Sequence, residues 1–199
     1  MERIKINGRY FRTLITKQQI DEAVDKVAVK VNEDYRDSKK PPMLMCILNG
    51  AIPFTAALMQ RLEFDNELVC MKVSSYNGTT DTTGHVITKV KPTADVSGRD
   101  ILICEDIVDT GITIRFLRKY LIEQGATDVK VCCLMYKPEK LRGRLIEEGL
   151  LTPESSDEEF KKFEPEYFAL QMPNDFLVGF GLDYDEIGRH HKDIYTLDE

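Results

Sequence analysis

The hydrophobic positions of the chain fall into short apolar runs separated by amphipathic stretches. Several runs have almost no polar residue, which predicts strands that are buried on both faces of a parallel sheet. These runs are Met43–Leu48, Leu68–Val73, Asp100–Cys104 and Val129–Tyr136. Their alternation with helical patterns predicts the α/β class.

Helical patterns lie between these runs. Thr16 and Gln19 have the spacing of a capping box, and an apolar stripe follows at steps of three and four residues, so the first helix should begin there and end near Tyr35. Further helices are predicted over Ile52–Leu62, from Thr113 to Gly125 and over Leu141–Leu151.

The remaining segments are polar or short. Ser74–Gly84 consists of small and turn-forming residues, which predicts a mobile loop, and Val86–Val90 could pair as the returning strand of a hairpin. Thr152–Lys162 is polar and acidic and is interpreted as an exposed insertion. A final β-like group covers Phe176–Leu182.

Composition limits the classes of function. With 199 residues we expect one domain, and the net charge of −7 argues against binding to nucleic acid or to an anionic membrane. No apolar run approaches the roughly 18 residues that span a bilayer, so we expect a soluble cytoplasmic protein. The five cysteines are predicted to be buried and reduced, and their spacing argues against a zinc site.

The segment with the clearest chemistry follows the third apolar run. A loop between a parallel strand and a helix lies at the carboxyl edge of the sheet, where α/β folds bind ligands, and Glu105–Thr113 is predicted to be such a loop. Its end, Thr110-Gly111-Ile112-Thr113, precedes a helix whose free amides favour a phosphate. The segment lacks the lysine and glycine spacing of a P-loop.

Three acids share this segment with the expected phosphate. Glu105 and Asp106 would repel a phosphate unless they contact a ribose diol or a divalent cation. Asp109 either accepts a proton from an attacking nitrogen or caps the following helix, and the sequence favours neither role.

The nine residues Glu-Asp-Ile-Val-Asp-Thr-Gly-Ile-Thr resemble the phosphoribosyl pyrophosphate motif of the type I phosphoribosyltransferases. From about Leu48 to Arg189, outside the acidic insertion 139–171, the chain resembles the hypoxanthine/guanine phosphoribosyltransferase family. The resemblance implies a mainly parallel sheet flanked by helices, a flexible active-site loop and a small hood. Residues 1–199 would form one domain, with the hood built from both chain ends.

The resemblance also implies roles for residues of the motif. Glu105 and Asp106 would hold the ribose hydroxyls, and the segment from Asp109 to Thr113, which includes Thr110, Gly111 and Ile112, would hold the 5′-phosphate. Asp109 would handle the proton on the purine N7 atom. Glu105 and Asp106, together with Asp183, would hold Mg²⁺.

Residues outside the motif receive roles in the same way. Ser75 and Tyr76 match the closing loop, and Lys137 matches a lysine that donates to the purine 6-oxo group. Phe176 would stack on the base, and the Leu177 backbone would meet the edge of the base. Arg189 would contact pyrophosphate directly.

Two positions depart from the family pattern. The early phosphate loop has Asn49-Gly50 where relatives commonly have Lys-Gly, and the motif has Ile112 where relatives often have lysine. Two cations near the phosphates are therefore missing. Backbone N–H groups could still hold pyrophosphate.

The resemblance predicts an enzyme of purine salvage. It would transfer the phosphoribosyl group from phosphoribosyl pyrophosphate to N9 of hypoxanthine or guanine with Mg²⁺, as a homodimer or homotetramer. Two alternatives remain open: a phosphoribosyl pyrophosphate sensor that binds nucleic acid, and a transferase that acts on a pyrimidine or on adenine.

Overall fold

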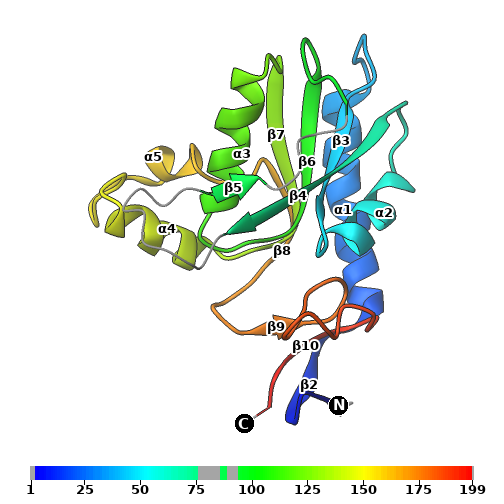
Figure 1. Cartoon of the computed structure of the whole chain (residues 1–199), viewed down its shortest axis with the longest axis vertical. Coiled ribbons are helices and arrows are strands. Elements are labelled where there is room, and N and C mark those ends of the chain that lie inside the picture. The colour runs from blue at the N-terminus through cyan, green and yellow to red at the C-terminus, as the bar shows by residue number, and fades with distance from the viewer. Residues whose placement is uncertain (1–2, 76–85, 89–93, 199) are drawn as a thin grey trace.

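The computed structural model describes residues 3–75, 86–88 and 94–198, and contains two β-sheets (Figure 1). The larger sheet has the strand order β5-β4-β3-β6-β7-β8. Its strands β3, β4, β6, β7 and β8 are parallel, and β5 pairs antiparallel with β4. The strands are β3 Met43–Leu48, β4 Glu67–Ser75, β5 Val86–Thr88, β6 Asp100–Val108, β7 Asp128–Tyr136 and β8 Tyr167–Gln171. The predicted fold class is confirmed.

Helices cover both faces of this sheet. Buried side chains of α1 and α2 pack on one face around Leu44 and Leu102, whereas α3, α4 and α5 pack on the other face around Met45 and Ile103. The helices are α1 Lys17–Tyr35, α2 Ile52–Met59, α3 Ile112–Glu123, α4 Pro138–Glu147 and α5 Asp157–Lys161. Within the described residues, every helix is too short or too polar to cross a membrane.

The smaller sheet joins the two ends of the chain and is called the hood below. It has the order β1-β2-β10-β9, and all of its pairings are antiparallel. Its strands are β1 Arg3–Ile6, β2 Arg9–Ile15, β9 Leu177–Val178 and β10 Ile194–Leu197. The hood lies at one end of the larger sheet, beside both termini (Figure 1). Of the predicted final strand Phe176–Leu182, only Leu177–Val178 form β9, and Gly179 and Leu182 form an isolated bridge on either side of a turn.

Helix boundaries follow local chemistry. The capping box at Thr16 forms as predicted: the Gln19 N–H donates to Thr16 Oγ1 at 3.3 Å, and the Thr16 N–H donates to Gln19 Oε1 at 2.9 Å. Helix α4 begins at Pro138, three residues before the predicted start, because proline suits the first turn of a helix. Helix α2 ends at Met59, before the predicted end at Leu62.

The acidic segment contributes more to the hydrophobic core than the sequence indicated. Most of Thr152–Lys162 is exposed as predicted, but Phe160 on α5 is buried in the core beneath α3 and α4. Ser156 and Glu159 form a second capping box at the start of α5. The region 139–171 thus supplies most of α4, all of α5 and the parallel strand β8, which was not predicted.

Two further predictions need correction, one about burial and one about secondary structure. Cys46, Cys104, Cys132 and Cys133 are buried free thiols as expected, but Cys70 on β4 is exposed. Ser74 and Ser75 belong to β4 and not to a loop, and β5 pairs with this strand as the returning strand of the hairpin. The rest of the predicted loop, residues 76–84, lies outside the described residues.

We predict that Leu134→Ala lowers the free energy of unfolding by about 2–5 kcal/mol. Leu134 is fully buried on β7 against the α1 face, so truncation leaves a cavity. Leu150→Ala is the matched control, because Leu150 is 49% exposed and should cost less than about 0.5 kcal/mol. Urea unfolding measures both, and equal losses would contradict this assignment of the core.

Candidate functional site

The predicted phosphate segment is a short turn between β6 and α3. Strand β6 continues to Val108 because it pairs with β7 up to Val108 and Tyr136, and α3 already begins at Ile112. The prediction of one loop over Glu105–Thr113 is therefore wrong at both ends. Glu105 and Asp106 lie in the strand, and only Asp109, Thr110 and Gly111 connect the two elements.

Gly111 allows this turn to be tight. Its φ of 71° lies in the left-handed region, and it occupies the N-cap position of α3. A Cβ atom at this residue would lie 2.4 Å from Leu141 Cδ1 on α4. The first amides of α3 have no carbonyl partner within the helix, so Ile112 and Thr113 present N–H groups suited to an anion.

Asp109 does not cap the helix. Gly111 is the N-cap, and no side chain makes a capping hydrogen bond there. Instead, Asp109 Oδ2 accepts a bond from Lys140 Nζ at 2.6 Å. Asp109 Oδ1 is buried and has no hydrogen-bond partner among the described residues. The capping alternative is wrong, and one carboxylate oxygen is left to interact with a ligand.

Glu105 and Asp106 form an acidic pair at the end of β6. Glu105 is buried, and its Oε2 atom has no hydrogen-bond partner in the described part of the chain. Burial, and then the charge of Asp106, raise the pKa of Glu105 well above its usual value. Burial thus makes the charged form of Glu105 less favourable in the ligand-free site than in water.

The predicted early phosphate loop lies against this pair. Gly50 is buried, and a Cβ atom there would lie 1.6 Å from Asp106 Oδ2. A Cβ atom on Gly181 would lie 2.0 Å from the Gly50 carbonyl oxygen. The ends of β3 and β6 thus meet the segment that follows β9, and only glycine fits at these two contacts. Asn49 is exposed beside them.

A pocket of 340 Å³ opens where the hood meets the ends of β6 and β7. It brings together four residues predicted from separate parts of the sequence: Asp109, Lys137, Phe176 and Leu177. No role was predicted for the other lining residues, which are Ile107, Lys140, Asn174, Asp175 and Leu182. Lys140 lies three residues after Lys137, a spacing that brings two side chains together on a helix. This spacing could have indicated that Lys140 lines the pocket.

Lys137 occupies the inner wall of this pocket and is 5% exposed. Its N–H donates to the Val108 carbonyl at 3.0 Å, and its Nζ donates to the Asp175 carbonyl at 2.8 Å. Burial lowers the pKa of Lys137 below its usual value, and the charge of Asp109 offsets only part of this effect. An ammonium group has three donors, so two can still turn toward a ligand.

Phe176 borders the pocket from the hood. It is 49% exposed, which is unusual for a large aromatic side chain and leaves ring area available for stacking. Its ring meets the edge of the Tyr184 ring at a centroid distance of 5.6 Å. Leu177, the next residue, is buried and begins β9.

Other predicted residues lie outside this pocket. Arg189 Nη2 pairs with Asp183 Oδ1 at 2.7 Å, and Arg189 Nη1 donates to the Gly181 carbonyl at 2.9 Å. Ser75 ends β4, and Tyr76 lies outside the described residues. Within residues 3–75, 86–88 and 94–198, no three His, Cys, Asp or Glu side chains gather as a ready metal site.

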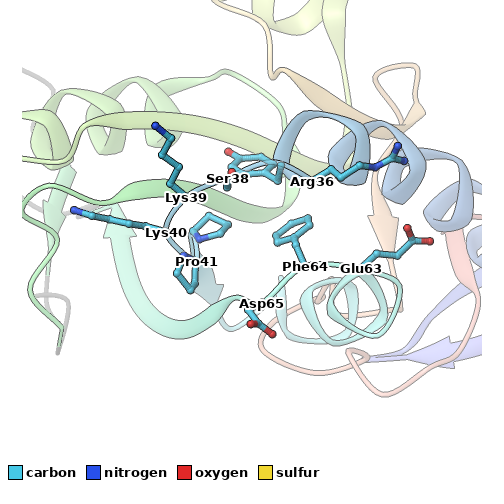
Figure 2. A pocket seen from close by; sticks show the side chains of 10 residues that line it. Arg36, Ser38, Lys39, Lys40, Pro41, Glu63, Phe64 and Asp65 are labelled. Carbon is cyan, nitrogen blue, oxygen red and sulfur yellow. The ribbon is translucent and has the colours of Figure 1, made fainter.

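A second pocket, of 280 Å³, lies at the opposite edge of the sheet, before β3 and β4. Figure 2 shows the rings of Pro41 and Phe64 inside it, whereas the long side chains of Arg36, Lys39 and Lys40 extend outward. Its basic groups do not converge on one point. None of the predicted site residues lines it.

Comparisons with known proteins identify the family. The family model of the phosphoribosyl transferase domain matches residues 13–160. The hypoxanthine-guanine phosphoribosyltransferase of Streptococcus pneumoniae is 37% identical over 188 residues, covering 94% of this chain and 93% of the relative. The Lactococcus lactis enzyme of the same name is 37% identical, covering 85% and 89% of the two chains.

Solved structures show the same relationship. The hypoxanthine-guanine phosphoribosyltransferase from Bacillus anthracis aligns with a TM-score of 0.76 at 26% identity, covering 94% of this chain and 98% of that one. A mutant hypoxanthine phosphoribosyltransferase from Trypanosoma cruzi, in complex with its product IMP, aligns with a TM-score of 0.77 at 27% identity, covering 98% and 93%. The chain therefore belongs to the hypoxanthine-guanine phosphoribosyltransferases of the type I phosphoribosyltransferase family.

Proposed function

We propose that the chain transfers the phosphoribosyl group of phosphoribosyl pyrophosphate to N9 of hypoxanthine or guanine, giving IMP or GMP and pyrophosphate. The observation that supports this most strongly is the pocket shared by Asp109, Lys137 and Phe176. It combines an acid, a cation and an exposed aromatic ring beside the start of α3. A planar 6-oxopurine next to a phosphorylated sugar needs these groups.

The base would lie against the Phe176 ring, which is exposed on the hood side of the pocket. Lys137 would donate to the 6-oxo oxygen with a proton that is not used at the Asp175 carbonyl. The Leu177 backbone would meet the edge of the base. Adenine has an amino group at this position, so a lysine there would face a donor and the pocket would reject it.

The sugar phosphate would lie at the turn that follows β6. The first amides of α3, with the hydroxyls of Thr110 and Thr113, would hold the 5′-phosphate. Glu105 and Asp106 would receive the two ribose hydroxyls. This role suits Glu105 because its Oε2 atom is buried without a partner in the described part of the chain, and a ribose hydroxyl would supply one.

Asp109, which lines the pocket, would accept the N7 proton as N9 attacks C1′. Departure of pyrophosphate leaves positive charge on C1′ and the ring oxygen. The carboxylates at the end of β6 would stabilise this charge, because fixed negative groups favour a developing positive charge. The protein thereby provides proton removal and charge stabilisation from one strand end.

Mg²⁺ would be shared between the protein and the substrate, with Asp183, Glu105 and Asp106 as the carboxylates that hold it. Oxygen donors suit this ion, and Mg²⁺ commonly binds through one or two carboxylates plus substrate phosphates. When bound, it neutralises charge on the leaving pyrophosphate. Asp183 must first release Arg189, which would then be free to contact pyrophosphate as well.

The remaining assignments complete the proposal. Ser75 and Tyr76 would close over the substrates and exclude water. Asn49 and Gly50 would hold pyrophosphate through the backbone. We propose one domain over residues 1–199, a homodimer or homotetramer, and action in the cytoplasm.

Initial velocity with a panel of bases tests this function. We expect formation of IMP from hypoxanthine and of GMP from guanine with saturating phosphoribosyl pyrophosphate and Mg²⁺, little product from adenine, and loss of both products on chelation with EDTA. A chain that forms no nucleotide from any base, but shifts RNA or DNA in a salt-sensitive gel assay, would favour the alternative of a regulator.

Asp109→Asn should lower kcat by about 10²-fold or more, with a much smaller change in the KM for phosphoribosyl pyrophosphate. The amide keeps the size of the side chain but cannot accept the proton. Steady-state kinetics measures both constants. An unchanged kcat would exclude Asp109 as the base.

Lys137→Gln should raise the KM for hypoxanthine and guanine by at least about 10-fold, because a charged donor to the oxo group is lost. The rejection of adenine should weaken, since glutamine can also accept a hydrogen bond. The control is Lys39→Gln at the opposite edge of the sheet. If the wild type and Lys137→Gln prefer hypoxanthine and guanine over adenine to the same degree, Lys137 does not select the base.

A further inference from the structure

Lys140 is a charged residue of the base pocket to which the proposed reaction gives no role. It lies in the first turn of α4, and its Nζ atom donates to Asp109 Oδ2 at 2.6 Å. It also lines the pocket beside Lys137. A lysine that is hydrogen-bonded to Asp109, the proposed proton acceptor, can control the orientation of the Asp109 carboxylate.

The backbone on both sides of this contact is fixed. Leu141, the next residue, is fully buried, and its N–H donates to the Lys137 carbonyl at 3.0 Å. Its side chain fills the space left by the missing Cβ of Gly111. The start of α4 is therefore packed against the turn that contains Asp109, so Lys140 is held next to the carboxylate.

The contact divides the two oxygens of Asp109. Oδ2 is engaged by Lys140, whereas Oδ1 is buried with no partner in the described part of the chain. A carboxylate on a short side chain can rotate about its terminal bond, and a strong charge-assisted bond to one oxygen limits that rotation. The other oxygen then keeps one direction.

We propose that Lys140 is a positioning residue that holds Asp109 through Oδ2 and so fixes the orientation of its carboxylate toward the N7 proton of the bound base. This inference rests on the proposed base role of Asp109. In the structure Asp109 Oδ2 accepts from Lys140, whereas the Lys137 Nζ atom donates to the Asp175 carbonyl. The ion pair contributes little to stability, because the Lys140 and Asp109 side chains are 43% and 32% exposed.

Lys140→Met tests the proposal, because methionine keeps the length of the side chain but removes the charge. We expect kcat to fall by about 10-fold, since a misaligned reacting group costs turnover, while the KM of each substrate stays within about 2-fold. Lys140→Arg should restore most of the kcat. Lys119→Met on α3 is the matched control, because Lys119 is 79% exposed and lies outside the pocket.

A double-mutant cycle with Asp109→Asn gives the decisive measurement. If Lys140 acts through the Asp109 carboxylate, Lys140→Met should reduce kcat no further in the Asp109→Asn background. Thermal unfolding confirms that each variant is folded, and Lys140→Gln replaces the methionine variant if that one does not fold.

Each other outcome overturns a defined part of the argument. A wild-type or higher kcat for Lys140→Met, failure of arginine to rescue, or additive losses in the cycle would overturn the positioning role alone. An Asp109→Asn variant with full turnover would show that Asp109 is not the proton acceptor. Lys140 would then have no reacting group to position. The two failures are therefore distinguishable.

Discussion

The parallel pairing of β6 with β7 is the interaction on which the rest of the site depends. The two strands stay in register to Val108 and Tyr136, and the Lys137 N–H extends the ladder by one bond to the Val108 carbonyl. Neighbouring strands lie about 4.8 Å apart, so the next residues on each strand emerge side by side. An acid, Asp109, and a buried cation, Lys137, thus share one pocket without any long loop.

Burial then sets the charge of the ligand-free site. It raises the pKa of Glu105 and lowers that of Lys137, so in both cases the neutral form is favoured more than in water. Such groups are incompletely satisfied until a ligand arrives: Glu105 has an unpaired oxygen within the described structure, and Lys137 has spare donors. Ribose hydroxyls and a purine oxo group supply the missing partners. Substrate binding can therefore restore interactions that folding left unmade.

The sequence predicted the large sheet and much of the site for the same physical reason. Strands buried on both faces leave uninterrupted apolar runs, whereas β8 and most of the hood strands are short, so their patterns are weak. The predicted loop began too early because Glu105 and Asp106, although polar, belong to β6, and it ended too late because α3 already begins at Ile112. Lys140 was missed because its partner Asp109 lies 31 residues away in sequence, and an isolated lysine on a helix is usually solvated.

The structure also bears on the two cations missing at Asn49 and Ile112. An anionic substrate beside three acids needs either added positive charge or reduced negative charge. A bound divalent cation would add positive charge, and burial also makes the charged form of Glu105 less favourable than in water. At Gly50 the backbone is pressed against Asp106 and the Gly181 segment, which leaves main-chain groups as the contacts available there. Main-chain N–H groups can thus make the contact that a lysine side chain at position 49 would otherwise make.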